Sequence, residues 1–175
     1  ELRLKSILEN IENRNSEAIR SKMSYMDFLL AVTQDEIDRR RFTKKESAIK
    51  KSNIGRCKNI IEFDFDFNPK INRQQIMNLA TCEFIKKNEN IIFAGPTGVG
   101  KTFLAKAIGL EACHRGYKVL FIRTAKMLEH IYSGKADATY HKKLELYIKC
   151  DLLILDDWGM VPFSDSLLNI LNEVI

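Results

Sequence analysis

The sequence predicts an α/β fold with a parallel sheet, preceded by a helical region. From residue 91 onward, short apolar segments alternate with helix-like segments of roughly 10–15 residues, which is the pattern of βαβ units. Before residue 60 the chain has no proline, and its apolar residues recur at helical spacing. We therefore expect a small helical region at 1–60 and an α/β region at 61–175.

The first 60 residues are expected to form helices. The segment SYMD at 24–27 is typical of a capping box, in which Ser24 caps a helix and Asp27 reaches back. The helix that it opens continues into a basic segment. An earlier helix has an apolar stripe at i, i+3, i+4, i+7 spacing, formed by Leu4, Ile7, Leu8 and Ile11.

The segment that follows changes its period from helical to two. In IIEFDFDFNP, at 60–69, Phe63, Phe65 and Phe67 alternate with acids, which indicates an extended linker or an edge strand. These rings either line a pocket for a nucleotide base or pack as an edge strand. NRQQIMNLATCEFIKK, at 72–87, then predicts one helix with Asn72 and Gln75 as its cap pair.

The remaining elements alternate between the two kinds. The expected strands are Ile91–Ala94, Lys118–Ile122 and Leu152–Leu155. The expected helices are 101–115, 125–133 and 139–149, the first two followed by glycines that stop them. No internal repeat or low-complexity segment is present.

A glycine-rich loop joins the first of these strands to its helix. It fits the pattern G-x-x-x-x-G-K-[ST], in which backbone N–H groups and a helix N-terminus surround phosphate oxygens. Lys101 can reach the β- and γ-phosphates, and the Thr102 hydroxyl can bind Mg²⁺. The residues expected to bind the nucleotide are Gly95, Pro96, Thr97, Gly98, Val99, Gly100, Lys101, Thr102 and Phe103.

A second element of the same site is LLILDD, at 152–157. Four apolar residues indicate a strand that is buried on both faces, and two carboxylates follow where it ends. Ligands bind at the carboxyl ends of such strands, so Asp156 is expected to hold Mg²⁺ directly or through water. Asp157 is expected to orient or deprotonate an attacking water. Lys101, Asp156 and Asp157 are therefore the candidate catalytic residues.

Other features exclude several classes of protein. Cys57, Cys82, Cys113 and Cys150 have no metal-binding or disulfide-framework spacing, which favours reduced thiols in a cytoplasmic protein. The three histidines also lack ligand spacing. No apolar run approaches the ~18 residues that span a bilayer, so we expect no membrane partner.

The positive charge of the chain is concentrated near its amino terminus. Residues 1–60 contain 14 Lys/Arg and 9 Asp/Glu, whereas the rest contains 14 of each. The segment 39–58 has nine basic residues and one acid, Glu46. It is either a solvated helix face or a surface that binds the phosphates of double-stranded DNA. We favour DNA, with Phe42 and Ile49 docked inward and the contacts made by Arg39, Arg40, Arg41, Lys44, Lys45, Lys50 and Lys51.

The sequence resembles the IstB-like AAA+ ATPases, which are helper proteins of insertion sequences related to DnaC-type helicase loaders. The likeness lies in FDFDF, in NENIIFAGPTGVGKTFLAKAIGLEACHRGYKVLFI and in CDLLILDDWGMVPF, and it covers about 60–163. It implies a P-loop fold of the AAA+ (ASCE) type, ATP and Mg²⁺ as cofactors, and ATP hydrolysis. Lys101, Thr102, Asp156 and Asp157 fall on the nucleotide-binding positions of the family.

The resemblance also implies a function. Such helpers form a nucleotide-dependent homo-oligomer on DNA and recruit or stimulate a transposase. One alternative is a loader that engages a replicative helicase, and a second is an adaptor that binds ATP without hydrolysing it. A small-molecule kinase is a weaker rival, because no motif for a substrate pocket follows the loop.

Two departures from the family pattern affect these expectations. The second acid is Asp157 where AAA+ proteins commonly have Glu, which puts the rate of hydrolysis in question. The sequence also ends at Ile175, before the strand that lies in AAA+ proteins between the two nucleotide-binding strands. We therefore expect the sensor residue and the arginine finger to come from a longer protein.

Overall fold

The computed structural model describes residues 4–160, 162 and 164–175. The chain divides into two compact units, residues 1–47 and residues 48–175. The functional boundary expected at 60/61 stays a prediction.

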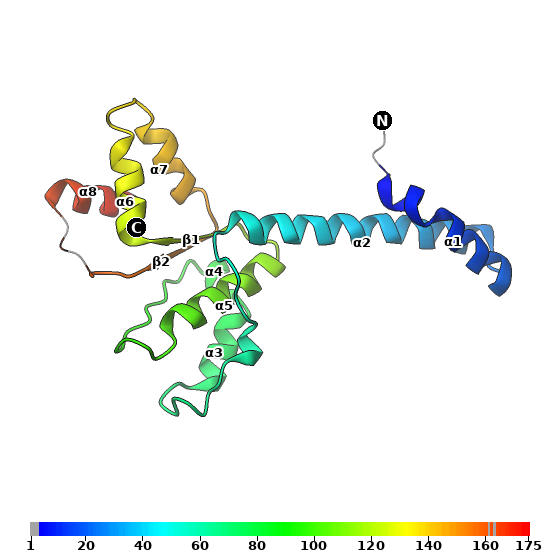
Figure 1. The fold of residues 1–175 in the computed structure, drawn as a ribbon, viewed down its shortest axis with the longest axis horizontal. Helices are drawn as coiled ribbons and strands as arrows, with labels where there is room; N and C mark the ends of the chain where they lie inside the picture. The colour runs from blue at the N-terminus through cyan, green and yellow to red at the C-terminus, as the bar shows by residue number, and fades with distance from the viewer. Residues whose placement is uncertain (1–3, 161, 163) are drawn as a thin grey trace. The chain divides into compact units, whose positions relative to one another are not determined.

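The first unit contains two helices, α1 (Lys5–Ser21) and most of α2 (Tyr25–Lys51) (Figure 1). The predicted cap between them is present, because the Ser24 hydroxyl accepts the Asp27 backbone N–H at 3.1 Å. The Asp27 carboxylate accepts a bond from the same hydroxyl at 2.7 Å. Ser24 therefore caps α2, as the sequence predicted.

Polar contacts hold α1 against α2. Glu36 is buried and accepts the backbone N–H of Ser6 at 2.9 Å. The Arg14 guanidinium donates two bonds to Asp35, at 2.8 and 2.7 Å. By contrast, the predicted apolar stripe of α1 is only partly covered, since Leu8 is 78% exposed. The fit between the two helices therefore depends on charged groups more than on apolar packing.

The second unit begins with the end of α2 and a short 3₁₀ helix, η1 (Ile60–Glu62). The phenylalanine segment after it is not a strand. Instead, the Asp64 carboxylate accepts the backbone N–H groups of Asp66 and Phe67 at 3.0 and 3.2 Å. Such side-chain bonds compete with a strand ladder and favour turns, which overrides the alternating pattern.

The expected helix at 72–87 is two helices, α3 (Arg73–Ala80) and α4 (Glu83–Lys86). The predicted cap is confirmed, because Asn72 Oδ1 accepts the Gln75 backbone N–H at 3.0 Å. The break lies at Cys82, whose φ of 60° is left-handed. Its fully buried side chain belongs to the core of this unit, so packing overrides the helical pattern there.

The sheet consists of two parallel strands, β1 (Val119–Arg123) and β2 (Leu152–Asp156), in the register that pairs Val119 with Leu152. Both were predicted to within one residue at each end. Of the four helices that the structure describes after the glycine loop, the first three were also predicted closely, whereas no bounds were predicted for the last one. They are α5 (Lys101–His114), α6 (Thr124–Ser133), α7 (Tyr140–Ile148) and α8 (Asp165–Val174).

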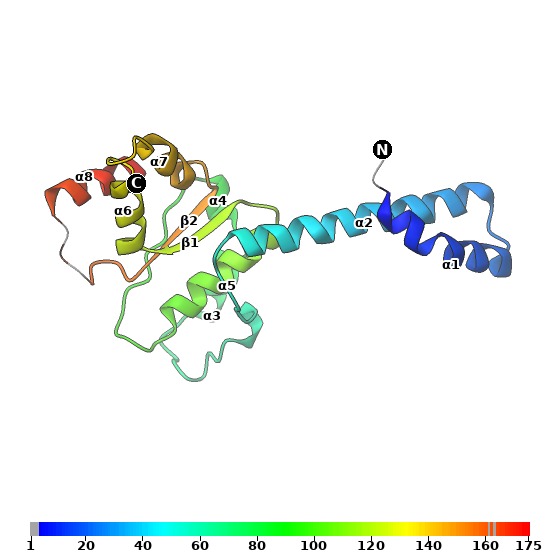
Figure 2. The same ribbon diagram turned by 45° about the horizontal axis from the view of Figure 1, so that its top comes forward.

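Helices cover both faces of this sheet. On one face of the sheet lies α5 (Figures 1 and 2). Phe121 and Ile154 pack against the cluster of buried residues to which α5 contributes. On the other face, α6, α7 and α8 enclose Leu120 and Leu153. The two apolar clusters explain why each strand reads as a continuous apolar run rather than as an alternating one. The result is a mixed α/β unit with a small parallel sheet.

The prediction of a strand at Ile91–Ala94 is wrong. Ile91 and Phe93 pack against the core, but Ile92 is 89% exposed, and the segment has no strand hydrogen bonds. A strand requires the N–H and C=O groups of a neighbour, and none of the described residues pairs with this segment. Within the part of the chain that the structure describes, no helix is long and apolar enough to cross a bilayer.

Candidate nucleotide-binding site

The glycine loop lies directly before α5 and adopts a backbone that glycine favours. Gly98 and Gly100 have φ values of 83° and 94°, in the left-handed region. Gly100 precedes the helix without a side-chain cap, so the first backbone N–H groups of α5 have no capping side chain. A helix start of this kind is suited to an anion, because the free N–H groups and the helix dipole both favour negative charge.

Gly100 is also in contact with an aromatic ring. A Cβ at this position would lie 2.7 Å from Phe63 Cε2 and 3.0 Å from Phe63 Cζ. The ring is held in turn by Phe103 and Phe65, with centroids 5.4 and 4.9 Å away. The phenylalanine segment therefore packs directly on the loop that the sequence assigned to phosphate binding.

Lys101 bends back over the same loop. Its ammonium donates to the carbonyl oxygens of Gly95 and Pro96, at 2.8 and 2.7 Å. The positive charge thus lies within the loop, at the place where the pattern requires a lysine for the β- and γ-phosphates. The ammonium has three donors, so these two bonds leave one free for a ligand oxygen.

The two predicted metal ligands lie side by side. The Thr102 hydroxyl donates to Asp156 Oδ1 at 2.9 Å, although the residues are 54 positions apart in the sequence. Thr102 stands at the start of α5, and Asp156 ends β2. A hydroxyl and a carboxylate are hard oxygen donors, the kind that Mg²⁺ prefers. This donor set therefore fits Mg²⁺, which Thr102 and Asp156 would hold.

Asp157 is oriented differently from its neighbour. Its φ of 55° takes the chain out of the strand, and its Oδ2 lies 3.2 Å from Arg123 Nε. Arg123 is the last residue of β1 and pairs with Asp156 in the sheet register. Next to it, the Thr124 hydroxyl donates to the Asp156 carbonyl oxygen at 3.0 Å.

Sequence reasoning missed Arg123 and Thr124. The signal was nonetheless available, because they come directly after the strand expected at 118–122. The carboxyl ends of neighbouring parallel strands meet at one edge, so polar residues at the end of β1 belong beside those at the end of β2.

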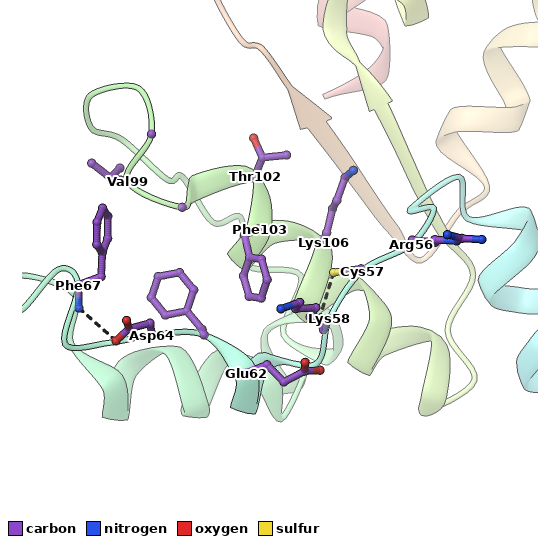
Figure 3. Close-up of a pocket in the computed structure, with 13 residues that line it drawn as sticks. Arg56, Cys57, Lys58, Glu62, Asp64, Phe67, Val99, Thr102, Phe103 and Lys106 are labelled. Carbon is purple, nitrogen blue, oxygen red and sulfur yellow. Dashed lines mark hydrogen bonds between the residues drawn. The ribbon is translucent and has the colours of Figure 1, made fainter.

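An open cleft of about 720 Å³ lies beside the loop. This volume is within the roughly 300–1,000 Å³ that is usual for small-molecule sites. Figure 3 shows the side chains of Phe67, Val99, Thr102 and Phe103 bordering the cleft. Phe63 lines it as well, whereas Phe65 lies under the Arg73 guanidinium, 5.4 Å from its ring. That Phe63 and Phe67 line a pocket for a nucleotide base remains a prediction, which this geometry supports.

Charged and sulfur-containing side chains complete the lining of the cleft. The Lys106 ammonium lies 4.7 Å from the centre of the Phe121 ring. Burial raises the pKa of the Cys57 thiol, which keeps it protonated near neutral pH and makes it a poor nucleophile. Thiol chemistry at Cys57 is therefore disfavoured.

The residues expected to bind DNA fall into two groups on α2. Three arginines are each paired with a carboxylate. The pairs are Arg39 with Glu9 at 3.1 Å, Arg40 with Glu36 at 2.8 Å and Arg41 with Asp38 at 3.8 Å. The lysines differ, since they are exposed and make no hydrogen bond or ion pair with the described residues. They are Lys44 and Lys45 in the first unit and Lys50 and Lys51 in the second.

The two apolar residues expected to anchor this helix differ in how far they are buried. Phe42 is 66% exposed, so the expectation that it docks inward is wrong. Ile49 is partly buried against the core of the second unit. A spacing of seven residues places two side chains on one side of a helix, but it does not supply a surface for both of them.

Similarity to known proteins establishes the family of this chain. The sequence matches the family described as IstB-like ATP binding protein over residues 1–175. The chain belongs to this family. It is 34% identical over 163 residues to an insertion sequence IS232 protein of Bacillus thuringiensis subsp. berliner that is named for ATP binding. It is 35% identical to the ATP-binding protein of insertion sequence IS5376 from Geobacillus stearothermophilus. It is 31% identical to the ATP-binding protein of insertion sequence IS21 from Pseudomonas aeruginosa.

These matches cover most of this chain but less of the relatives. The alignments include 93%, 87% and 93% of this IstB-like chain, and 65%, 61% and 62% of the three relatives. The chain thus spans less than two thirds of the length of the curated relatives that it matches. The recognition of the family from the glycine loop and the LLILDD strand is confirmed.

Proposed function

We propose that this protein is an ATP-dependent, DNA-binding helper of transposition with an AAA+ type P-loop core. The observation that carries the proposal is the 2.9 Å bond between Thr102 and Asp156 at the mouth of the glycine loop. It unites the hydroxyl and the carboxylate that a P-loop ATPase needs for Mg²⁺. The family description and the names of the relatives, which combine ATP binding with insertion sequences, support the same reading.

The residues of the site have distinct roles in this proposal. Backbone N–H groups of the loop and of the start of α5 bind the phosphates, and Lys101 exchanges its carbonyl partners for phosphate oxygens. Thr102 and Asp156 hold Mg²⁺, which neutralises phosphate charge when it is bound. Phe63, Phe67 and Phe103 offer apolar surface to the base at the side of the loop.

Hydrolysis requires Asp157 to act on a water molecule. In the structure its carboxylate faces Arg123, and both side chains are at least half exposed. An exposed ion pair of this kind contributes only about 0–1 kcal/mol, so it can break at little cost. We therefore assign Asp157 the role of orienting the attacking water once the phosphates are in place.

DNA binding and partner recruitment form the second half of the proposal. The exposed lysines of α2 suit the phosphates of double-stranded DNA, because they have no carboxylate to give up among the described residues. ATP binding would drive assembly of several copies on DNA, and hydrolysis would release them. We propose a transposase as the partner; the relatives are named for insertion sequences and for ATP binding.

The test compares the full-length protein with Lys101→Ala. Removal of the ammonium is expected to lower ATP uptake and to abolish phosphate release above background. Nucleotide-dependent assembly on DNA, measured by light scattering, should be lost as well. Lys149→Ala is the matched control, because this exposed lysine pairs only with Glu145 among the described residues. No change of assembly with a non-hydrolysable ATP analogue would overturn the proposal.

The comparison of phosphate release and a separate pull-down distinguish the alternatives. If Lys101→Ala and the wild type release phosphate at the same background rate while both bind DNA, the protein is an adaptor that does not hydrolyse ATP. If the protein retains a replicative helicase in a pull-down and does not retain the transposase, it is a helicase loader. The feature that favours the adaptor is the aspartate at position 157, where AAA+ proteins commonly have a glutamate.

A further inference from the structure

The end of β1 provides a contact that the nucleotide-binding motifs do not include. Thr124, the first residue of α6, is fully buried, and its hydroxyl donates to the Asp156 main-chain carbonyl at 3.0 Å. The side chain of Asp156 accepts the Thr102 hydroxyl at 2.9 Å. Three elements, α6, β2 and α5, are thus joined through one aspartate.

The backbone needs support at this point. Directly after Asp156, the chain turns into the left-handed conformation of Asp157, whose φ is 55°. A non-glycine residue in this conformation is uncommon, although aspartate adopts it more readily than most residues, and it persists where the surroundings hold it. The Thr124 hydroxyl holds the carbonyl of the peptide that leads into the turn.

We infer that Thr124 is a positioning residue for the magnesium site: its buried hydroxyl fixes the Asp156–Asp157 peptide and so keeps the Asp156 carboxylate directed at Thr102. This inference rests on the proposed function, because it assumes that Asp156 and Thr102 hold Mg²⁺. A simple structural role for the buried hydroxyl would affect the stability of the fold and leave the metal dependence unchanged.

The substitutions are chosen to separate these roles. Thr124→Val keeps the shape of the side chain but removes the donor, whereas Thr124→Ser retains the hydroxyl. Thr81→Val is the matched control, since the Thr81 hydroxyl also donates to a main-chain carbonyl, that of Asn78, at 2.7 Å. If Thr124→Val does not fold, Thr124→Ala replaces it in the same comparison.

The measurement is ATP uptake by the full-length protein, titrated with Mg²⁺ and repeated in EDTA. Thr124→Val is expected to raise the Mg²⁺ concentration for half-maximal uptake roughly tenfold, the size usual for groups that orient metal ligands. Uptake in EDTA should stay the same, and Thr124→Ser should restore the wild-type titration. Thr81→Val should titrate like the wild type.

Two contrary outcomes have different meanings. A Thr124→Val protein with the wild-type Mg²⁺ titration overturns the inference and leaves the proposed function intact. A wild-type protein whose ATP uptake does not depend on Mg²⁺ overturns the inference together with the magnesium site of the proposed function.

Discussion

Gly100 shows how one residue links the loop to its surroundings. Its φ of 94° and the Phe63 ring 2.7 Å from a would-be Cβ both exclude a larger residue. Gly100→Ala is therefore expected to add about 1–2 kcal/mol of backbone strain and to displace the ring as well. We expect a lower free energy of unfolding and weaker ATP uptake, measured by urea unfolding and by nucleotide titration.

Gly116 is a matched control for this substitution. Its φ of 93° is nearly the same, but a Cβ there would meet nothing within 4 Å. Gly116→Ala should therefore show the strain alone, with ATP uptake unchanged. Equal effects of the two substitutions on uptake would contradict a specific role for the contact between Gly100 and Phe63.

The individual residues of the site were predictable to different degrees. Lys101, Thr102 and Asp156 follow from a local pattern, because the loop and the strand end each carry their own spacing. Arg123 and Thr124 belong to no motif, and only their place directly after an expected strand indicates them. Their role depends on the pairing of β1 with β2, which brings residues 32 or more positions apart into contact.

Charged groups contribute to the contact between α1 and α2. Hydrogen bonds from Arg14 of α1 lower the pKa of Asp35 below its ordinary 3.8. The pKa of Glu36 is lowered below 4.5, chiefly by Arg40 of the same helix and also by the Ser6 backbone N–H of α1. A carboxylate with a lowered pKa stabilises the folded form above its unfolded pKa and loses this effect as the pH falls through the folded value. Acidification from about pH 6 to pH 3 should therefore loosen α1 from α2.

Hydrogen exchange can measure this loosening. After correction for the intrinsic rate at each pH, the protection of α1 amides should fall more than that of α5 amides. Arg14→Gln should reduce the difference, since Asp35 then has a nearly ordinary pKa in both the folded and unfolded states. A decrease in protection of equal size in α1 and α5 would show that acid acts on the whole chain instead.

Strands were predicted well where the burial of their apolar residues is enough to define them. Both strands of the sheet read as apolar runs because helices cover each face. Ile91–Ala94 has the same composition, but a strand also needs a partner to complete its hydrogen bonds. The break at Cys82 and the turns after Phe63 likewise arise from tertiary packing and side-chain bonds that periodicity does not report.

For the molecule as a whole, the basic segment predicts how binding to DNA depends on salt. Four exposed lysines without partners among the described residues would give a slope of about −3 to −4 for log K against log salt. This is smaller than five or more contacts would give, because the arginines of α2 must first leave their carboxylates.

The test replaces two lysines of the first unit in the full-length protein, Lys44→Gln with Lys45→Gln. Binding to duplex DNA, followed by fluorescence anisotropy over a range of salt concentrations, should weaken, and the slope should decrease in magnitude by about 2.

The control replaces Lys86 and Lys149 by Gln, because each is paired with a glutamate and lies outside the basic segment. Both variants lose two positive charges. If they lose the same affinity and slope, net charge governs binding and the lysines of α2 have no special role; a loss confined to Lys44 and Lys45 places the phosphates at that helix.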